Sequence, residues 1–228
     1  MAWGVHFFTA SGIVCCLLAL EATNREDWRT SLFWLAVAVF IDAVDGSLAR
    51  LAQVKRVLPG FDGALLDNIV DYVSYVVVPA LIMHRAGLFP TSLSLALAAA
   101  VCIASAWQFC QSDAKTADHF FKGFPSYWNI VALYLLALEQ TTTVNFVIIT
   151  ILILLVFVPV KYLYLSRNVP WPAITLPMTL VWTVLASMIL WQLPSASPAL
   201  VWGSLGYPAW YLGLSLHATM QEMRKDPA

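Results

Sequence analysis

Four aspartates occur in this chain as two closely spaced pairs. Asp42 and Asp45 are three residues apart, and Asp67 and Asp71 are four residues apart. Residues at these intervals share one face of a helix, so each pair projects two carboxylates in one direction. All four lie within or beside apolar stretches long enough to cross a membrane, where ionisable side chains are costly and usually functional. Two such pairs facing each other across a helix hairpin would form an acidic site, which mutual repulsion disfavours unless cations occupy it.

The donor atoms of this acidic site indicate which cation it would hold. Carboxylate oxygens without an accompanying His or Cys cluster favour Mg²⁺ or Mn²⁺ over zinc. Four carboxylates can hold two ions, and two ions about 4 Å apart stabilise the attacking and leaving oxygens of a phosphoryl displacement. Any single aspartate at a helix end is also explained by solvation, and we interpret Asp62, in the loop outside both pairs, in that way. The set of four predicts two-metal phosphoryl-transfer chemistry.

The residues around the two pairs suit a bulky ligand that carries phosphate. Gly46 and Ala49 leave space on the helix of the first pair, although small residues also serve close helix packing. Arg50 ends the same stretch, and its planar guanidinium can pair with a phosphate. Gly63 opens the segment of the second pair and lets backbone or ligand approach closely.

The composition is that of an integral membrane protein. The chain has 228 residues, of which 61% are hydrophobic and 11% are charged, and its mean hydropathy is +0.77. A soluble domain carries about 25% charged residues. A net charge of −1 gives no basic face for nucleic acid. We therefore expect an all-α, multi-pass membrane protein.

About eight stretches are apolar enough to be transmembrane helices, each near the length of about 20 residues that a membrane requires. Proline is expected to kink the third of them at Pro79. Pro125 suits the first turn of the fifth. The predicted spans are Val5–Ala22, Ser31–Arg50, Gly63–Met83, Leu93–Gln111, Pro125–Leu138, Val144–Leu165, Ile174–Leu193 and Leu200–His217.

The basic residues predict which way these spans are oriented. With eight spans, both termini lie on one side, and the loops and tail of that side contain nine of the 12 Lys and Arg residues. The nine are Arg50, Lys55, Arg56, Lys115, Lys122, Lys161, Arg167, Arg224 and Lys225, against Arg25, Arg29 and Arg85 on the other side. Cytoplasmic loops are enriched in Lys and Arg, so we expect cytoplasmic termini and an aspartate site at the cytoplasmic face.

The complete pattern, D-x-x-D-G-x-x-A-R followed by G-x-x-x-D-x-x-x-D, resembles the signature of the CDP-alcohol phosphatidyltransferases, and all eight defined positions match. Members of that family join a CDP-linked group to an alcohol and release CMP, within a core of six helices. The resemblance implies that residues 1–166 form this core and that residues 167–228 add two helices to the same integrated domain. These last helices contain no charge within the membrane, so we expect them to pack against lipid or to form a homodimer contact.

The segment between the two halves of the motif narrows the resemblance further. Leu51 to Asp62 makes a spacer of twelve residues, longer than in most of the family. This length is similar to that of a bacterial branch, which forms phosphatidylcholine from CDP-diacylglycerol and free choline. Other stretches also resemble that branch, namely Val5-His6-Phe7-Phe8-Thr9-Ala10, Val54-Lys55-Arg56-Val57-Leu58-Pro59, Phe121-Lys122-Gly123-Phe124-Pro125 and Trp128-Asn129.

The resemblance also implies a role for each position of the motif. Asp71 would be the general base that accepts the proton of the alcohol, which is a poor nucleophile at neutral pH. The alcohol oxygen would then attack the β-phosphorus, with a route through a covalent intermediate left open. By the same match, the metal ligands would be Asp42, Asp45, Asp67 and Asp71, and the residues facing the CDP group would be Asp45, Gly46, Ala49, Arg50 and Gly63.

Choline would require a further set of residues. Its quaternary ammonium cannot donate ordinary N–H hydrogen bonds, so aromatic faces and nearby carboxylates must recognise it. Aromatic residues make up 13% of the chain, and packing or the membrane interface explains many of them. The candidates on the cytoplasmic side are Tyr72, Tyr75, Tyr127 and Trp128, the last being preferred, with Asn129 as a polar neighbour and Lys122 as a possible phosphate contact.

These inferences together predict an enzyme of the bacterial cytoplasmic (inner) membrane that uses CDP-diacylglycerol, choline and two Mn²⁺ or Mg²⁺ ions. One alternative is a related enzyme with serine, inositol or glycerol 3-phosphate as acceptor. Another is a transporter of cations or choline, in which the carboxylates would line a path. The aspartates all lie at one membrane face and none lies at mid-depth in later spans, which argues against a path.

Overall fold

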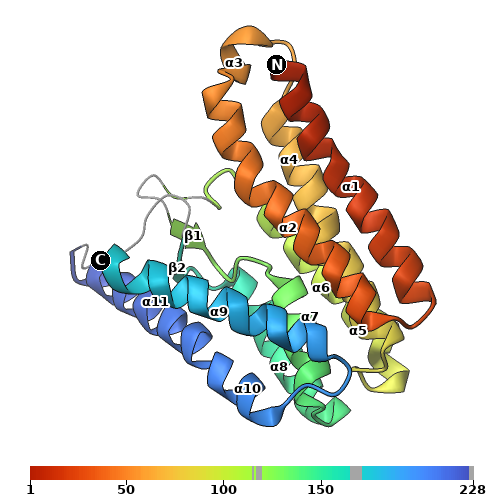
Figure 1. Ribbon diagram of the computed structural model, residues 1–228. Helices are drawn as coiled ribbons and strands as arrows, with labels where there is room; N and C mark the ends of the chain where they lie inside the picture. Colours follow the sequence, from red (N-terminus) through yellow and green to blue (C-terminus); the bar gives the residue numbers. More distant parts are fainter. Residues whose placement is uncertain (115, 117–119, 165–170, 226–228) are drawn as a thin grey trace. The chain divides into compact units, whose positions relative to one another are not determined.

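The computed structural model describes residues 1–114, 116, 120–164 and 171–225, and nearly all of its regular structure is helical (Figure 1). The helices are α1 (Ala2–Asn24), α2 (Trp28–Leu51), α3 (Val54–Val57), α4 (Gly63–Asp71), η1 (Tyr72–Val77), α5 (Val78–Arg85), η2 (Thr91–Leu93), α6 (Ser94–Phe109), α7 (Trp128–Leu138), α8 (Thr142–Phe157), α9 (Pro172–Gln192), α10 (Pro198–Ser204) and α11 (Gly206–Lys225). The strands β1 (Phe120–Lys122) and β2 (Lys161–Leu163) form one antiparallel pair.

Five helical stretches within the described residues are long and apolar enough to cross a membrane. They are Ala2–Asn24, Trp28–Leu51, Gly63–Arg85, Thr91–Phe109 and Pro172–Gln192, with two shorter apolar helices at Trp128–Leu138 and Thr142–Phe157. Large apolar side chains such as Phe7, Phe40 and Leu180 are more than half exposed, as expected on lipid-facing helices. The prediction of an all-α, multi-pass membrane protein is thus confirmed at this level. The number eight and the side of the termini stay predictions.

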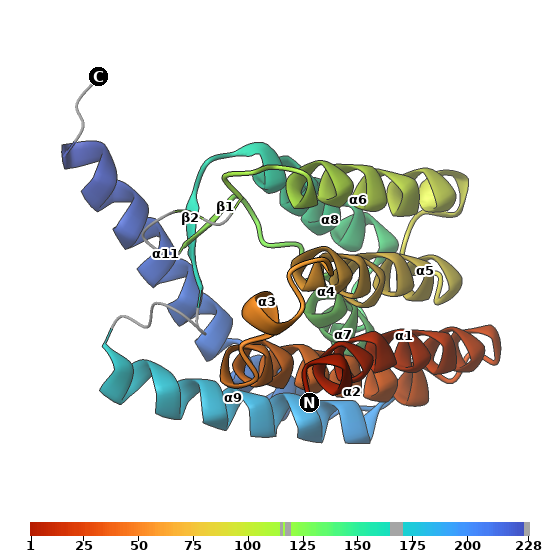
Figure 2. The same ribbon diagram turned by 90° about the horizontal axis from the view of Figure 1, so that it is seen from above.

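The chain forms two compact units, of which the first contains Met1–Cys102 and Tyr127–Leu133. In this unit α1 and α2 make a hairpin, and α4 lies beside both of them in the two views (Figures 1 and 2). Asp27 caps α2 by accepting a hydrogen bond from the Thr30 N–H at 3.0 Å, and hydrogen bonding from Thr30 lowers the pKa of Asp27. A Cβ at Gly12 of α1 would lie 2.7 Å from a methyl carbon of Val70, so only glycine allows this approach of α1 to α4.

The third predicted span is one continuous helical stretch with an irregular centre. It begins as α4, continues as the π-helix η1 and ends as α5. Pro79 follows η1 by two residues, and a proline has no N–H for the carbonyl four residues before it. A π-helical stretch pairs residues five apart instead of four, so it suits a helix that lacks one donor. The irregularity expected at Pro79 therefore occurs as a π-helical segment that begins directly after Asp71.

The second unit contains Ile103–Ser126 and the chain from Tyr134 onward. The sixth span was expected to run to Leu165, but α8 ends at Phe157, and Val158 has an extended backbone. Pro159 explains this correction because the residue before a proline is disfavoured in the helical conformation. The next residues pair as β2 with β1, so that Lys122 lies opposite Lys161.

The other helix ends also differ in detail from the prediction. Pro125 does not open the fifth helix, because Ser126 has a positive φ of 55° and α7 begins only at Trp128. The eighth predicted span is divided between α10 and α11, which are separated at Leu205. The division predicted between residues 166 and 167 lies outside the described residues and stays a prediction.

Candidate functional site

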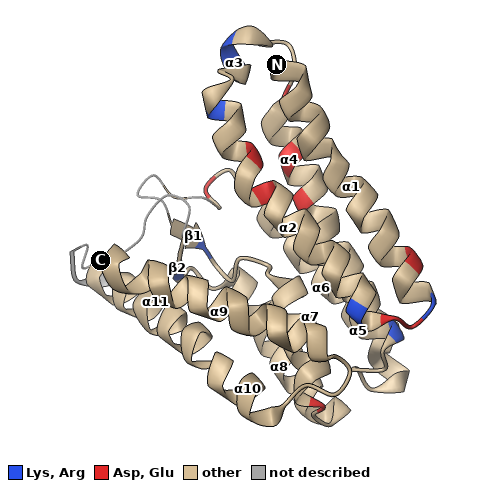
Figure 3. Cartoon of the chain, in the orientation of Figure 1, with Lys and Arg blue, Asp and Glu red and all other residues tan. Residues whose placement is uncertain are grey.

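Three of the four motif aspartates meet in the first unit. Asp42 of α2 and Asp67 and Asp71 of α4 each offer one carboxylate oxygen, and these oxygens all lie within 4.8 Å of one another. The three side chains are partly buried. Asp67 and Asp71 are one turn apart, so their carboxylates point the same way, and the hairpin brings α2 to that face. Figure 3 shows acidic positions at the same level on α2 and α4.

This carboxylate triad (Asp42, Asp67 and Asp71) fits a hard divalent cation. Three negative charges at this separation, among apolar helices, repel each other strongly unless a cation or protons neutralise them. All the donor atoms are oxygens, which Mg²⁺ and Mn²⁺ prefer. The triad would therefore hold the metal that the sequence predicts, while the identity and number of the ions remain predictions.

Asp45 lies outside the carboxylate triad and has a different contact. It is 5% exposed, and its carboxylate accepts a 2.7 Å hydrogen bond from the Thr9 hydroxyl of α1. Three residues turn a helix by roughly 300°, so Asp45 is offset from Asp42 and faces α1 instead of α4. The structure thus brings together three of the four predicted ligands. A metal or CDP role for Asp45 stays a prediction.

A tyrosine adjoins the triad on the next helical turn. The Tyr75 hydroxyl donates a 2.8 Å hydrogen bond to Asp42 Oδ2. Its ring lies next to that of Tyr127, with centroids 6.0 Å apart and ring planes at 47°. Two of the predicted choline-binding aromatic residues therefore lie together beside a carboxylate of the triad.

The smaller motif residues lie along the same hairpin. A Cβ at Gly46 would meet the Arg50 guanidinium at 3.5 Å, and Arg50 itself is exposed and donates to the Ser47 hydroxyl at 2.9 Å. Ala49 packs against a buried cluster that includes Val5 of α1. Thus Arg50 has the exposure that a phosphate contact requires, whereas Ala49 has a packing role in the structure.

Asp62 has a structural role in addition to the solvation that the sequence predicted for it. It is exposed, but its carboxylate accepts hydrogen bonds from the N–H groups of Ala64 and Leu65 at 3.1 and 3.0 Å. This is the contact of a helix N-cap, and it begins α4 at Gly63. The signal was present in the sequence, because an Asp just before an apolar helix that starts with Gly is a common cap.

The remaining predicted residues make contacts of their own. Tyr72 donates to the Cys102 carbonyl at 2.9 Å. Trp128 is completely buried, and Asn129 accepts a hydrogen bond from the Ile130 N–H. Lys122 forms an exposed 2.7 Å ion pair with Asp113, which lowers the pKa of Asp113 through the hydrogen bond and the charge of Lys122. Ligand roles for these four residues stay predictions.

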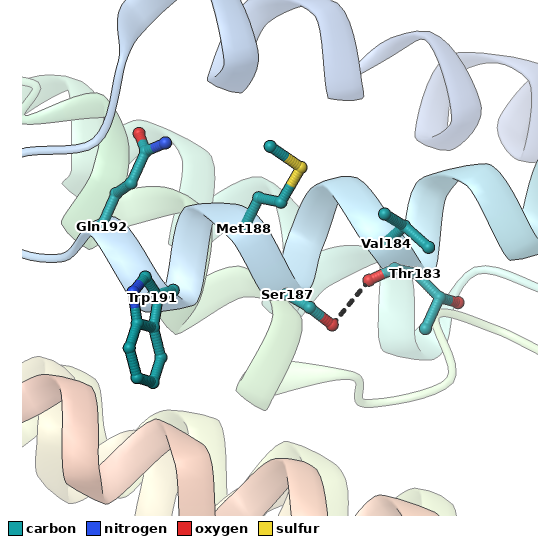
Figure 4. Close-up of a pocket in the computed structure, with 6 residues that line it drawn as sticks. All are labelled: Thr183, Val184, Ser187, Met188, Trp191 and Gln192. Atoms are coloured by element: carbon teal, nitrogen blue, oxygen red, sulfur yellow. Dashed lines mark hydrogen bonds between the residues drawn. The ribbon is translucent and has the colours of Figure 1, made fainter.

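A separate hollow lies on α9 of the second unit (Figure 4). None of the six residues that line it is charged, and its polar groups include the Ser187 hydroxyl, which donates to the Thr183 carbonyl at 2.8 Å. Because α9 is one of the candidate membrane spans, such an open apolar hollow suits lipid contact. This hollow therefore offers no charged group for catalysis, in contrast to the carboxylate triad.

Comparison with known proteins shows the family of the chain. Residues 5–210 match the family described as CDP-alcohol phosphatidyltransferase. A phosphatidylcholine synthase of Legionella pneumophila is 43% identical over 98% of this chain and 91% of its own length. Those of Legionella bozemanae (50% identical over 66% of this chain and 70% of its own length) and Pseudomonas aeruginosa (34%, 97% and 93%) are also similar. With its motif intact and its carboxylates clustered, the chain belongs to the CDP-alcohol phosphatidyltransferase family.

Proposed function

We propose that this protein is a phosphatidylcholine synthase, which transfers the phosphatidyl group of CDP-diacylglycerol to choline and releases CMP. The observation that carries the proposal is the carboxylate triad, in a chain whose relatives over almost its full length are phosphatidylcholine synthases. A triad of oxygens at one end of a helix hairpin suits phosphoryl transfer to a small alcohol. The twelve-residue spacer from Leu51 to Asp62 supports choline as that alcohol.

The proposed chemistry is a direct displacement at phosphorus. Asp71 accepts the hydroxyl proton of choline, and the choline oxygen forms a bond to the phosphorus that carries diacylglycerol. The bond from that phosphorus to the bridging oxygen breaks, and its electron pair leaves with CMP. Asp42 and Asp67, together with Asp71, would hold the divalent cation. When bound, the cation neutralises charge on the pyrophosphate and stabilises the leaving group.

Tyr75 and Tyr127 are the best supported choline contacts among the predicted candidates. Their rings lie next to each other with their planes at 47°, and the Tyr75 hydroxyl donates a hydrogen bond to Asp42. A quaternary ammonium is bound by aromatic faces and by nearby negative charge, and both are present here. Trp128 has no exposed surface, so it would contact choline only after a rearrangement. We therefore place the choline site between the two tyrosines and the triad.

We further propose that the site opens to the cytoplasm from the bacterial inner membrane. Arg50, Lys55 and Arg56 are exposed where α2 leads into α3, and Figure 3 shows basic positions on α3 and on the adjoining end of α2. Excess positive charge marks cytoplasmic loops and also attracts the anionic head of CDP-diacylglycerol. CDP-diacylglycerol would enter from the bilayer and choline from the cytoplasm.

An acceptor panel tests the proposed specificity. Purified protein is mixed with CDP-diacylglycerol, Mn²⁺ or Mg²⁺, and labelled choline, serine, inositol or glycerol 3-phosphate. We expect labelled lipid with choline alone, formed in step with CMP. Labelled lipid from another alcohol but not from choline would show that the acceptor is a different alcohol. The reaction class would stay the same. Choline uptake into sealed vesicles without CMP release would favour the transporter alternative.

A further inference from the structure

A cluster of three rings lies at the start of α1, beside the glycine that begins α4. Trp3 and His6 are neighbours on α1, and Phe61 precedes α4. The ring centroids are 4.4 Å apart for His6 and Phe61, 5.4 Å for Trp3 and Phe61, and 6.1 Å for Trp3 and His6. Trp3 is 52% exposed and Phe61 38%, whereas His6 is only 6% exposed. The cluster therefore has an accessible aromatic surface above a buried imidazole.

The imidazole of His6 lies directly on Gly63. A Cβ at position 63 would be 2.6 Å from His6 Cε1, closer than real side chains allow, and 3.1 Å from Nδ1. The second glycine of the family motif thus admits the His6 ring in this chain. Substitution of Gly63 by any other residue would have to displace that ring.

His6 also has an unsatisfied polar atom. Its Nε2 is buried, and it has no hydrogen-bond partner among the residues that the structure describes. Native proteins rarely leave such an atom unpaired, because burial removes its contact with water without replacing it. A bound ligand with a polar edge would supply the missing partner.

Aromatic faces around one buried polar atom suit a nucleobase. Any base can stack on an aromatic side chain, and a hydrogen bond to the edge of the base adds selectivity. Gly63 and Asp67 are one turn apart on α4, a separation of about 6 Å along the helix axis. The cluster and the carboxylate triad are thus placed to receive the base and the pyrophosphate of one nucleotide.

We propose that Trp3, His6 and Phe61 bind the cytosine base of the CDP-linked substrate, with His6 Nε2 accepting a hydrogen bond from the 4-amino group. The edge with the 4-amino group is opposite the bond to ribose, so it enters deepest and reaches the buried nitrogen. Trp3 and Phe61 stack on the base nearer the surface. This inference rests on the proposed function only in taking a cytidine nucleotide as the ligand.

The test compares two nucleotides that differ by one group. Binding of CDP and of the pyrimidin-2-one riboside diphosphate, which lacks only the 4-amino group, is measured to the full-length protein in detergent with Mn²⁺ and without choline. Wild type should bind CDP about 3- to 10-fold more tightly, as expected for one hydrogen bond. His6→Phe should bind the two nucleotides within about twofold of each other. No preference in wild type, or full preference in His6→Phe, would overturn the proposal.

Two surface variants keep the test decisive if His6→Phe does not fold. Phe61→Ala should weaken binding of both nucleotides by about tenfold, because stacking does not depend on the 4-amino group. Phe7→Ala, on the same helix and 73% exposed, should leave both affinities unchanged. Unchanged binding by Phe61→Ala counts against the proposed site. Wild-type protein that shows the CDP preference but makes no phosphatidylcholine would refute the proposed function and leave this site standing.

Discussion

Asp42 and Asp45 are neighbours in the motif, yet their carboxylates have different surroundings. Asp42 lies in the carboxylate triad, whereas Asp45 is buried against Thr9 of α1. The spacing of the aspartates predicted a shared helix face, because that is a local property of the chain. The contact with Thr9 joins residues 36 positions apart, so it depends on how α1 packs on α2, and no local pattern specifies it. Sequence reasoning singled out the aspartates but missed Thr9, the side chain that contacts one of them.

Thr9→Val tests whether this hydrogen bond positions Asp45. The substitution keeps the volume of the side chain but leaves a buried carboxylate without its donor, at a cost of about 1.5–3 kcal/mol. We expect a lower thermal midpoint in detergent and at least a tenfold loss of phosphatidylcholine synthesis. Thr9→Ser, which restores the hydroxyl, should recover most of both. Full activity of Thr9→Val would show that Asp45 needs no support from α1.

Tyr127→Leu tests the proposed contact between choline and the two tyrosine rings. Loss of one aromatic face removes a cation–π contact worth about 0.5–2 kcal/mol, so the KM for choline should rise by about 2- to 30-fold. The KM for CDP-diacylglycerol and kcat should change little. Phe40→Leu, an exposed aromatic residue on α2, is the matched control. An unchanged KM for choline in Tyr127→Leu would move the choline site to other residues.

At the scale of helices, apolar length predicted where most of them lie but not where each one ends. α1, α2, α9 and the stretch from α4 to α5 agree with the expected spans to within a few residues. The end of α8 at Phe157 and the delayed start of α7 depend on Pro159 and on the positive φ of Ser126. An apolar run of sufficient length hides such breaks, because hydropathy does not report backbone conformation. The π-helical η1 was foreseen only as an irregularity at Pro79.

Asp27→Ala tests the start of α2, the helix that contributes Asp42 to the triad. Loss of the N-cap should cost about 0.5–2 kcal/mol of stability, measured by thermal unfolding at neutral pH, and Asp27→Asn should retain most of it. The hydrogen bonds of Asp27 lower its pKa in the folded state. Its contribution is therefore present above the unfolded pKa of about 3.9 and is lost as the pH falls below that value. Equal stability of all three proteins at neutral pH would contradict this role for Asp27.

For the molecule as a whole, composition and motif predicted more than the helix pattern did. A charged fraction of 11% sufficed for the membrane class, and the eight motif positions sufficed for the family, which residues 5–210 match. Orientation in the membrane is harder to predict from the sequence, because it depends on the loop charges and on the number of spans. Of the described helical stretches, five are both long and apolar enough to cross a membrane. Sidedness therefore requires its own experiment.

Single cysteines in a chain whose four native cysteines are replaced test the predicted sidedness. Lys55→Cys, between α2 and α4, should react with a membrane-impermeant thiol reagent only after the inner membrane is opened. Arg25→Cys, in the turn between α1 and α2, should react in intact spheroplasts. Both native side chains are exposed, so access is limited by the membrane alone. The reverse labelling pattern would place the triad on the outer face.

The most direct test of the central claim is incorporation of labelled choline into phosphatidylcholine by the wild type and by Asp71→Asn, with CDP-diacylglycerol and Mn²⁺. Asp62→Asn, an exposed helix cap outside the triad, serves as the matched control. The wild type and Asp62→Asn should form phosphatidylcholine and CMP in equal amounts. Asp71→Asn should bind CDP-diacylglycerol yet turn over at least a hundredfold more slowly, as expected for a lost general base. Phosphatidylcholine synthesis by Asp71→Asn at the wild-type rate would contradict the account.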